Sequence, residues 1–280
     1  MRVLVVGATG VLGRHTIPRL IECGHTVRAL IRRPEQAPPL AFWGAETALG
    51  DILDPATLAP ALAGCDAALH LATAVPRPGQ PAEWSRNDAI RRDGTRHLLA
   101  AAERAGVRRY LQQSITFIYG SQGATIVSES TPLNAPARLA SAVEMEEAVQ
   151  ASPLEWCILR GGALYGPGTG REDDWRQQAR ASRLALPGDG SALISLIHAA
   201  DFARAIVLAA ESAPRGSVYN VVDDMPVTYR ELYGYIATQI GAPHPATGGH
   251  TVDSLGCDNS RLKAALDWLP CYPSYRSGLA

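Results

Sequence analysis

The stretch VLVVGATGVLGR, residues 3–14, decides the fold of this chain. Residues 3–6 form a short, wholly apolar run, which is typical of a buried parallel strand. Gly7, Gly10 and Gly13 then let the chain turn tightly, let backbone N–H groups approach a pyrophosphate and let a helix pack on the strand. No Gly-Lys-Ser/Thr follows, which excludes a Walker A loop. The stretch therefore predicts a dinucleotide at the N-terminus of the first helix.

Strand and helix patterns alternate after this loop. Strands are predicted at 25–31, within 44–51, at 66–73, within 108–120 and at 154–160, with helices at 56–65, 93–106 and 138–151. This order predicts an α/β fold, a doubly wound parallel sheet of Rossmann type. We expect a dinucleotide-binding domain at 1–165. Residues 166–280 are expected to form a smaller mixed α/β substrate-binding or lid region, interleaved with the last Rossmann elements, with a polar loop at 166–175 and a helix at 200–212.

The bulk composition is that of an ordinary globular protein, with 46% apolar and 19% charged residues. A formal net charge of -1 gives no electrostatic case for nucleic acid or an anionic membrane. No run reaches the roughly 20 apolar residues of a membrane span. Five scattered cysteines without a C-x-x-C pair indicate neither a disulfide framework nor a metal site. We expect a cytoplasmic protein that binds a small molecule, and the sequence leaves its oligomeric state open.

The end of the second strand indicates which dinucleotide is bound. Arg32 lies 19 residues beyond Gly13, and Arg33 follows it. A carboxylate there would hold the ribose hydroxyls of NAD, whereas an arginine suits the 2′-phosphate of NADP. Arg14 is a further basic residue near the loop. We expect NADPH or NADP as the cofactor; the alternative is that both arginines are solvated at a strand end.

Several later segments occur in a fixed order: GDILD (50–54), HLAT (70–73), DGTRHLL (93–99), SITFIYG (114–120), LRGGALYGPG (159–168), LIHAADFARAI (196–206) and YNVVDD (219–224). Together these blocks resemble the extended and atypical short-chain dehydrogenase/reductase family, which includes nucleotide-sugar epimerases and dehydratases. The resemblance implies that Asp51 and the next backbone amide meet the adenine. His198 and Asp201 are expected to form a buried structural pair.

The glycine loop and the resemblance together define the expected site. The expected cofactor-binding residues are Gly7, Thr9, Gly10, Val11, Leu12, Gly13, Arg14, Arg32, Arg33, Asp51, Ile52, Leu71, Ala72, Thr73, Ser114, Gly161 and Gly162. The expected substrate-binding residues are Thr116, Phe117 and Tyr165, in an apolar cleft built from segments near 75–85, 115–120, 163–185 and 250–256. No metal ligands are expected, and no catalytic residue is assigned.

The proton-transfer residues of the family have no counterpart here. The family uses a Ser/Thr, a Tyr and a Lys, and the register set by IYG (118–120) places these on Ile115, Leu139 and Val143. An error of register would not change this conclusion. Lys263 is the only lysine and Asn259 lies four residues before it, so the chain contains no Tyr-x-x-x-Lys. Leu139 and Val143 are expected to form apolar walls of the pocket.

Two functions are consistent with this pattern: an NADPH-dependent reductase, or a non-catalytic NADP(H)-binding sensor. Loss of a general acid forfeits about 10²–10⁴-fold in rate, while positioning of the reactants is still worth several kcal/mol. A large, flat, apolar ketone that carries its own phenol would lessen the need for the acid. The pattern resembles the atypical ketoreductases of actinobacterial aromatic polyketide antibiotic pathways, which implies an angucyclinone-like substrate. Epimerase or dehydratase action is disfavoured because it needs the missing base.

Overall fold

The computed structural model describes residues 1–76 and 83–280. Its centre is a seven-stranded sheet in the order β11-β7-β5-β4-β1-β2-β3, and every pairing in it is parallel. The strands are β1 (Arg2–Val6), β2 (Thr26–Ile31), β3 (Glu46–Leu49), β4 (Ala67–His70), β5 (Arg109–Ile115), β7 (Glu155–Gly161) and β11 (Ser217–Val221). The predicted doubly wound parallel sheet is confirmed.

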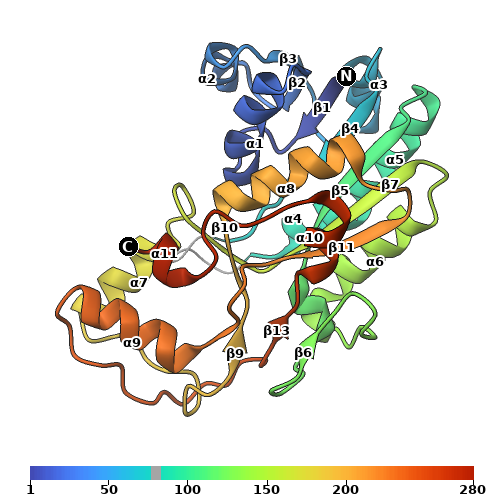
Figure 1. Cartoon of the computed structure of the whole chain (residues 1–280). Helices are drawn as coiled ribbons and strands as arrows, with labels where there is room; N and C mark the ends of the chain where they lie inside the picture. The colour runs from blue at the N-terminus through green and yellow to red at the C-terminus, as the bar shows by residue number, and fades with distance from the viewer. Residues whose placement is uncertain (77–82) are drawn as a thin grey trace.

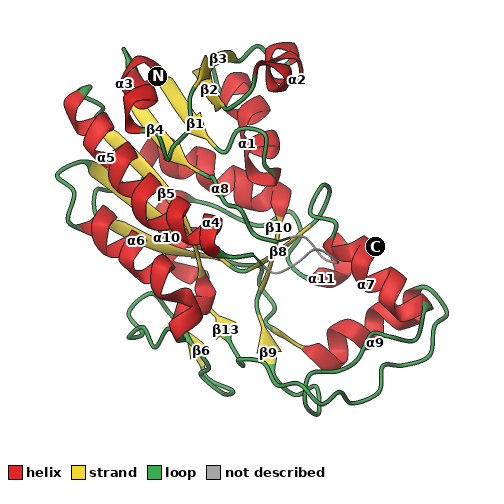
Figure 2. Ribbon diagram, turned by 180° about the vertical axis from the view of Figure 1, so that it is seen from behind, coloured by secondary structure: helices red, strands yellow, loops and turns green. Residues whose placement is uncertain are grey.

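Helices cover both faces of this sheet. Figure 1 shows α1 and α8 in front of the strands, and Figure 2 shows α3, α5 and α6 on the other side. Side chains alternate along a strand, so Val3 and Val5 of β1 pack in one core layer while Leu4 and Val6 pack in the other. The covering helices are α1 (Val11–Glu22), α2 (Ala37–Phe42) and α8 (Ala199–Ser212) on the first face, and α3 (Leu58–Leu62), α5 (Thr95–Arg104) and α6 (Ala140–Gln150) on the second.

A second, smaller core lies beyond the carboxyl edge of the sheet. Trp175, Leu196, Leu232 and Tyr275 are buried in it, and the C-terminus ends beside α7 and α11 (Figure 1). It is built from α7 (Arg171–Arg180), α9 (Tyr229–Gln239), α11 (Tyr275–Gly278) and short strands β8 (Ala163–Tyr165), β9 (Leu193–Ile194), β10 (Leu196–His198) and β12 (Val227–Thr228). Strand β11 is part of the central sheet and helix α8 covers one face of it, although both follow residue 165. The boundary at 165/166 stays a prediction.

Two local features differ from the sequence expectation. The polar segment 166–175 is not a loop throughout, because α7 begins at Arg171 directly after Gly170, whose φ is 70°. Glu172, Asp173 and Asp174 in the first turn of α7 favour a helix start, since carboxylates stabilise a helix N-terminus. A second difference lies before α5: helix α4 (Ser85–Ala89) continues into a π-helical turn, η3 (Ile90–Gly94).

The remaining described elements are short. They are η1 (Pro34–Gln36), η2 (Pro55–Thr57), η4 (Thr116–Tyr119), η5 (Ala137–Leu139), β6 (Ile126–Val127), β13 (Gly256–Cys257) and α10 (Ser260–Leu266). Within residues 1–76 and 83–280, no helix is both long and apolar enough to cross a bilayer.

Candidate cofactor and substrate cleft

The glycine loop has the geometry that a diphosphate requires. Gly7 has φ 90°, and a Cβ there would lie 2.5 Å from the Ala72 nitrogen. A Cβ on Gly13 would lie 2.4 Å from the Gly7 carbonyl oxygen, so the third glycine lets α1 pack on the turn. The first turn of α1 holds no acidic side chain, so the positive end of the helix dipole is free to attract an anion. These residues fit a dinucleotide pyrophosphate.

A cleft of about 1000 Å³ runs along the carboxyl edge of the sheet. It passes the ends of β3, β2, β1, β4 and β5 in turn, which is where ligands bind in open α/β sheets. The expected cofactor residues that line it are Gly7, Thr9, Gly10, Val11, Leu12, Arg14, Arg32, Asp51, Ile52, Leu71, Ala72, Thr73 and Gly162. The structure thus brings these residues together, and their contacts with a cofactor stay predictions.

Four expected cofactor residues lie outside the cleft lining. Gly13 packs beneath the loop, and Gly161 packs against Phe202, whose ring would lie 2.3 Å from an added Cβ. Ser114 is buried and its hydroxyl donates to Glu146 Oε1 at 2.5 Å, so it joins the end of β5 to α6. Arg33 is exposed at the strand end, beside the lining residue Arg32.

Only Phe117 of the three expected substrate residues lines the cleft. The placement predicted for Thr116 is wrong, because its buried hydroxyl turns inward and donates to the Gly161 carbonyl at 3.3 Å. The placement of Tyr165 is also wrong. Its ring is fully buried against His198, and its hydroxyl donates to the Ser274 carbonyl at 3.4 Å. Burial raises the pKa of Tyr165 well above that of an ordinary tyrosine.

The segments expected to build the substrate end are partly correct. Residues Val75, Pro76 and Trp84 line the cleft, as does the region from Ala163 to Trp175. Residues 77–82 lie outside the described part of the chain. The segment 250–256 is not part of the lining, because it pairs instead with β6 and with the loop near Gln122.

The apolar wall that was expected from Leu139 and Val143 forms only in part. Leu139 and Ile115 line the cleft, whereas Val143 does not. Arg138, the residue before Leu139, also lines it, and its Nη2 lies 2.7 Å from Asp253 Oδ2. The sequence reasoning missed this arginine because it followed the register of the absent tyrosine.

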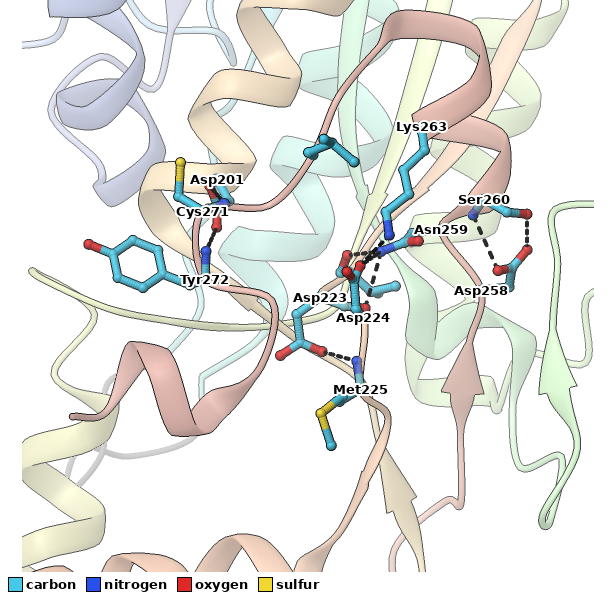
Figure 3. A network of polar contacts seen from close by, with 12 residues as sticks. Asp201, Asp223, Asp224, Met225, Asp258, Asn259, Ser260, Lys263, Cys271 and Tyr272 are labelled. Atoms are coloured by element: carbon cyan, nitrogen blue, oxygen red, sulfur yellow. Dashed lines mark hydrogen bonds and ion pairs between the residues drawn. The ribbon is translucent and has the colours of Figure 1, made fainter.

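The single lysine has a structural role. Nζ of Lys263 lies 2.6 Å from Asp224 Oδ1, and the amide of Asn259 donates to the same oxygen at 2.8 Å, as Figure 3 shows. Neither Lys263 nor Asp224 lines the cleft. This lysine therefore does not substitute for the missing catalytic one.

His198 and Asp201 are buried but do not form the expected pair with each other. Nδ1 of His198 accepts the Ala200 N–H, and its ring lies 3.8 Å from that of Tyr272. The Asp201 carboxylate accepts the N–H groups of Cys271 and Tyr272 at 2.9 and 2.8 Å (Figure 3). Both residues thus hold the C-terminal segment against α8.

Arginines dominate the charge of the cleft. The lining includes two acidic residues, Asp51 and Asp174, and six arginines: Arg14, Arg32, Arg86, Arg91, Arg138 and Arg171. Four of these arginines, Arg86, Arg91, Arg138 and Arg171, were not identified from the sequence as site residues. Gln36 was also missed, although its Oε1 accepts the Arg32 and Arg33 N–H groups at 2.9 and 3.1 Å and fixes that strand end. A cleft of this charge suits anionic ligands.

Three proteins with known names are similar to this chain in sequence. A 3-diazoavenalumate denitrifying reductase from Streptomyces sp is 35% identical over 306 aligned positions, covering 100% of this chain and 99% of that protein. A 4-hydroxy-2-methyl-3-oxo-4-farnesyl-3,4-dihydroquinoline-1-oxide ketoreductase from Stigmatella aurantiaca is 30% identical, with 83% of this chain and 71% of that protein covered. A 2-alkyl-3-oxoalkanoate reductase from Stenotrophomonas maltophilia is 29% identical, covering 87% and 77%.

Solved structures agree with this relationship. The dTDP-glucose 4,6-dehydratase DesIV from Streptomyces venezuelae, solved with NAD, matches with a TM-score of 0.86 at 27% identity, covering 100% of this chain and 95% of that one. The model of the NAD dependent epimerase/dehydratase family matches residues 3–222. With its parallel sheet, glycine loop and edge cleft, the chain belongs to the NAD dependent epimerase/dehydratase family.

Proposed function

We propose that the protein is an NADPH-dependent ketoreductase whose substrate is a large, flat, mostly apolar aromatic ketone of the angucyclinone type. The observation that carries this proposal is the continuity of the cleft, which runs from the glycine loop to a wall formed by Ile115, Phe117, Leu139 and Trp175. NADPH would supply the hydride. Arg32 at the end of β2 supports the phosphorylated cofactor.

The proton of the reaction comes from the substrate or from solvent in this proposal. Where α6 begins, the wall carries Leu139, which has no proton to give. The hydroxyls of Ser114, Thr116 and Tyr165 are buried and already donate to protein oxygens. A ketone with a phenol hydrogen-bonded to its carbonyl brings its own acid. The work of the chain is then to orient the acceptor toward the hydride donor.

A second kind of hydride acceptor, an aromatic diazonium group, is favoured by the relative whose alignment covers the whole chain. That protein is named for reducing 3-diazoavenalumate with loss of nitrogen. When hydride reaches a carbon that bears a diazonium group, a C–H bond forms, the C–N bond breaks, and its electron pair leaves with dinitrogen. This reduction consumes no proton, whereas reduction of a ketone leaves an alkoxide that must take up a proton. A site without a general acid suits such an acceptor equally well.

The test is NADPH oxidation by the purified protein with four kinds of acceptor: polycyclic aromatic ketones, their analogues with a phenol beside the carbonyl, arenediazonium salts and nucleotide sugars. We expect turnover of the phenol-bearing ketones, with the diazonium salts as the competing outcome. Turnover of nucleotide sugars alone contradicts the proposal. Tight NADPH binding without any turnover identifies the protein as the non-catalytic sensor instead.

A further inference from the structure

Arg91 differs from the other arginines of the cleft by its burial. It is 7% exposed, while the other five lining arginines are exposed or half-buried. It stands in the π-helical turn η3, which packs against α6. Single π-helical turns occur frequently at functional sites. In this chain Arg91 lines the cleft, whereas the next residue, Arg92, remains near the surface and pairs with Glu144 at 2.8 Å.

The Arg91 guanidinium has little compensation from the protein. Its Nη1 donates to the Ser141 hydroxyl at a long 3.5 Å, and that hydroxyl donates in turn to Asp88 Oδ1 at 2.6 Å. Among the residues that the structure describes, no carboxylate lies within ion-pair distance of Arg91. Burial lowers its pKa, and Asp88 acts in the opposite direction. An arginine has five N–H donors and stays charged, so a cation buried in this way favours an anion beside it.

The position of Arg91 assigns that anion to the acceptor end of the cleft. Ser141, which it contacts, lies in the first turn of α6, two residues after the lining residue Leu139. The glycine loop and Arg32, which suit the phosphates of the cofactor, lie at the other side of the sheet centre, next to β1 and β2. Arg91 is therefore placed toward the substrate.

The other two arginines near this end, Arg138 and Arg171, are more exposed than Arg91. Arg138 forms an ion pair with Asp253 at 2.7 Å. Nε of Arg171 donates to the Leu164 carbonyl at 2.9 Å, and its guanidinium lies over the Trp175 ring. Arg91 is thus the one buried arginine of the described cleft lining, and the described protein places no carboxylate within ion-pair distance of it.

We propose that Arg91 forms an anion-binding subsite and that the substrate carries a carboxylate or phenolate oxygen that this guanidinium binds. This inference rests on the proposed reductase function and extends it. The substrate is then an acidic aromatic compound, with a flat apolar body against Phe117 and Trp175 and one anionic oxygen at the α6 wall.

The experiment is a calorimetric titration of the NADP⁺-loaded protein with 2-naphthoate and with uncharged 2-naphthamide. We expect wild type to bind the naphthoate roughly tenfold to a hundredfold more tightly, because a hydrogen bond to a charged group is worth about 1.5–3 kcal/mol. Arg91→Met should remove this preference and leave naphthamide binding unchanged. Arg92→Met is the matched control and should keep the preference. A wild type without the preference, or an Arg91→Met variant that keeps it, overturns the proposal.

Binding of NADP⁺ and reduction of an acceptor show which of the two proposals fails, the anion-binding subsite or the reductase function. If Arg91→Met instead loses NADP⁺ binding, the guanidinium serves the cofactor, and the subsite is overturned while the reductase proposal stands. If the naphthoate preference depends on Arg91 but no acceptor is reduced, the subsite stands and the reductase proposal fails. Thermal unfolding reports on folding: Arg91→Met should be as stable as wild type, because replacement of a buried, poorly compensated cation by an apolar side chain is neutral or stabilising. A large loss of stability would indicate a structural arginine and contradict the proposal.

Discussion

Arg160 at the end of β7 and Glu146 in α6 form a buried ion pair that joins the sheet to the helix beside the cleft. Nη2 of Arg160 lies 2.6 Å from Glu146 Oε2, and the two residues are 4% and 1% exposed. The same carboxylate accepts the Ser114 hydroxyl, and Nη1 of Arg160 donates to the Tyr119 hydroxyl at 2.7 Å. This network fixes α6, and with it the position of Leu139, relative to the end of β5.

Removal of one member of this network should destabilise the fold. Glu146→Ala leaves the Arg160 charge buried without its partner, which typically costs about 3–5 kcal/mol. Urea unfolding gives the free-energy change. The control is Glu144→Ala, which removes the partly exposed Arg92–Glu144 pair and should cost no more than about 1 kcal/mol. Equal effects of the two substitutions would show that the buried network does not hold α6 in place.

Reversal of charge at Arg32 should change cofactor preference. Arg32→Asp places a carboxylate beside the expected 2′-phosphate, so NADPH binding should weaken roughly a hundredfold while NADH binding changes little. Arg108→Asp is the matched control, because Arg108 is exposed, lies outside the cleft lining and is not an expected cofactor residue. Fluorescence titration measures both affinities. Equal weakening of NADPH and NADH would remove the argument for the phosphorylated cofactor.

A methyl group at Gly13 should disturb the loop. A Cβ there would lie 2.4 Å from the Gly7 carbonyl oxygen and 2.5 Å from that of Ala8, so α1 must shift away from the turn. We expect Gly13→Ala to cost about 1–3 kcal/mol of unfolding free energy and to weaken dinucleotide binding. Gly249→Ala, which meets no heavy atom within 4 Å, is the control. Normal cofactor binding by Gly13→Ala would contradict the assignment of the loop.

Asp223 should make the stability of the protein depend on pH. Burial raises the pKa of Asp223 to about 8, whereas an unfolded aspartate titrates near 3.8. Between these values the folded state holds a proton that the unfolded state releases, so stability falls as pH rises from about 4 to about 8. Asp223→Asn keeps an acceptor for the Met225 N–H and should flatten this fall.

Thermal unfolding at pH 5 and pH 8 measures the effect of Asp223→Asn. The control is Asp267→Asn, since it removes an exposed carboxylate that is not among the charges acting on Asp223 and should leave the slope with pH in place. An unchanged slope in Asp223→Asn would mean that Asp223 is ionised in the folded protein at neutral pH.

The sequence predicted the sheet and the cofactor end of the cleft because both follow from local patterns. The apolar run at 3–6 and the glycine spacing specify a strand, a turn and a helix that are contiguous in the chain. Arg32 follows directly from the end of β2, where parallel strands present their carboxyl ends to a ligand, and Asp51 was expected from the resemblance of the GDILD segment that follows β3. These residues could be placed without knowledge of any long-range contact.

The substrate end could not be predicted in the same way, because side-chain direction there depends on packing between distant segments. Tyr165 points into the core because it contacts Ser274 and His198. Both of these residues lie more than thirty residues away from it in the sequence. Arg91 and Arg92 are adjacent in the sequence and lie in the same π-helical turn, yet the first is buried in the cleft wall and the second lies near the surface. No sequence pattern marks that turn.

The most direct test of the central claim is deuterium transfer from NADPH labelled at C4 to a phenol-bearing aromatic ketone. It should be measured for wild type and for Ser114→Ala, Thr116→Val and Tyr165→Phe. Proton supply by the substrate or solvent predicts a deuterium-labelled alcohol from all four proteins, with rates within a few-fold of wild type. A loss of about a hundredfold or more in any one folded variant would identify a protein hydroxyl as the acid and contradict the account.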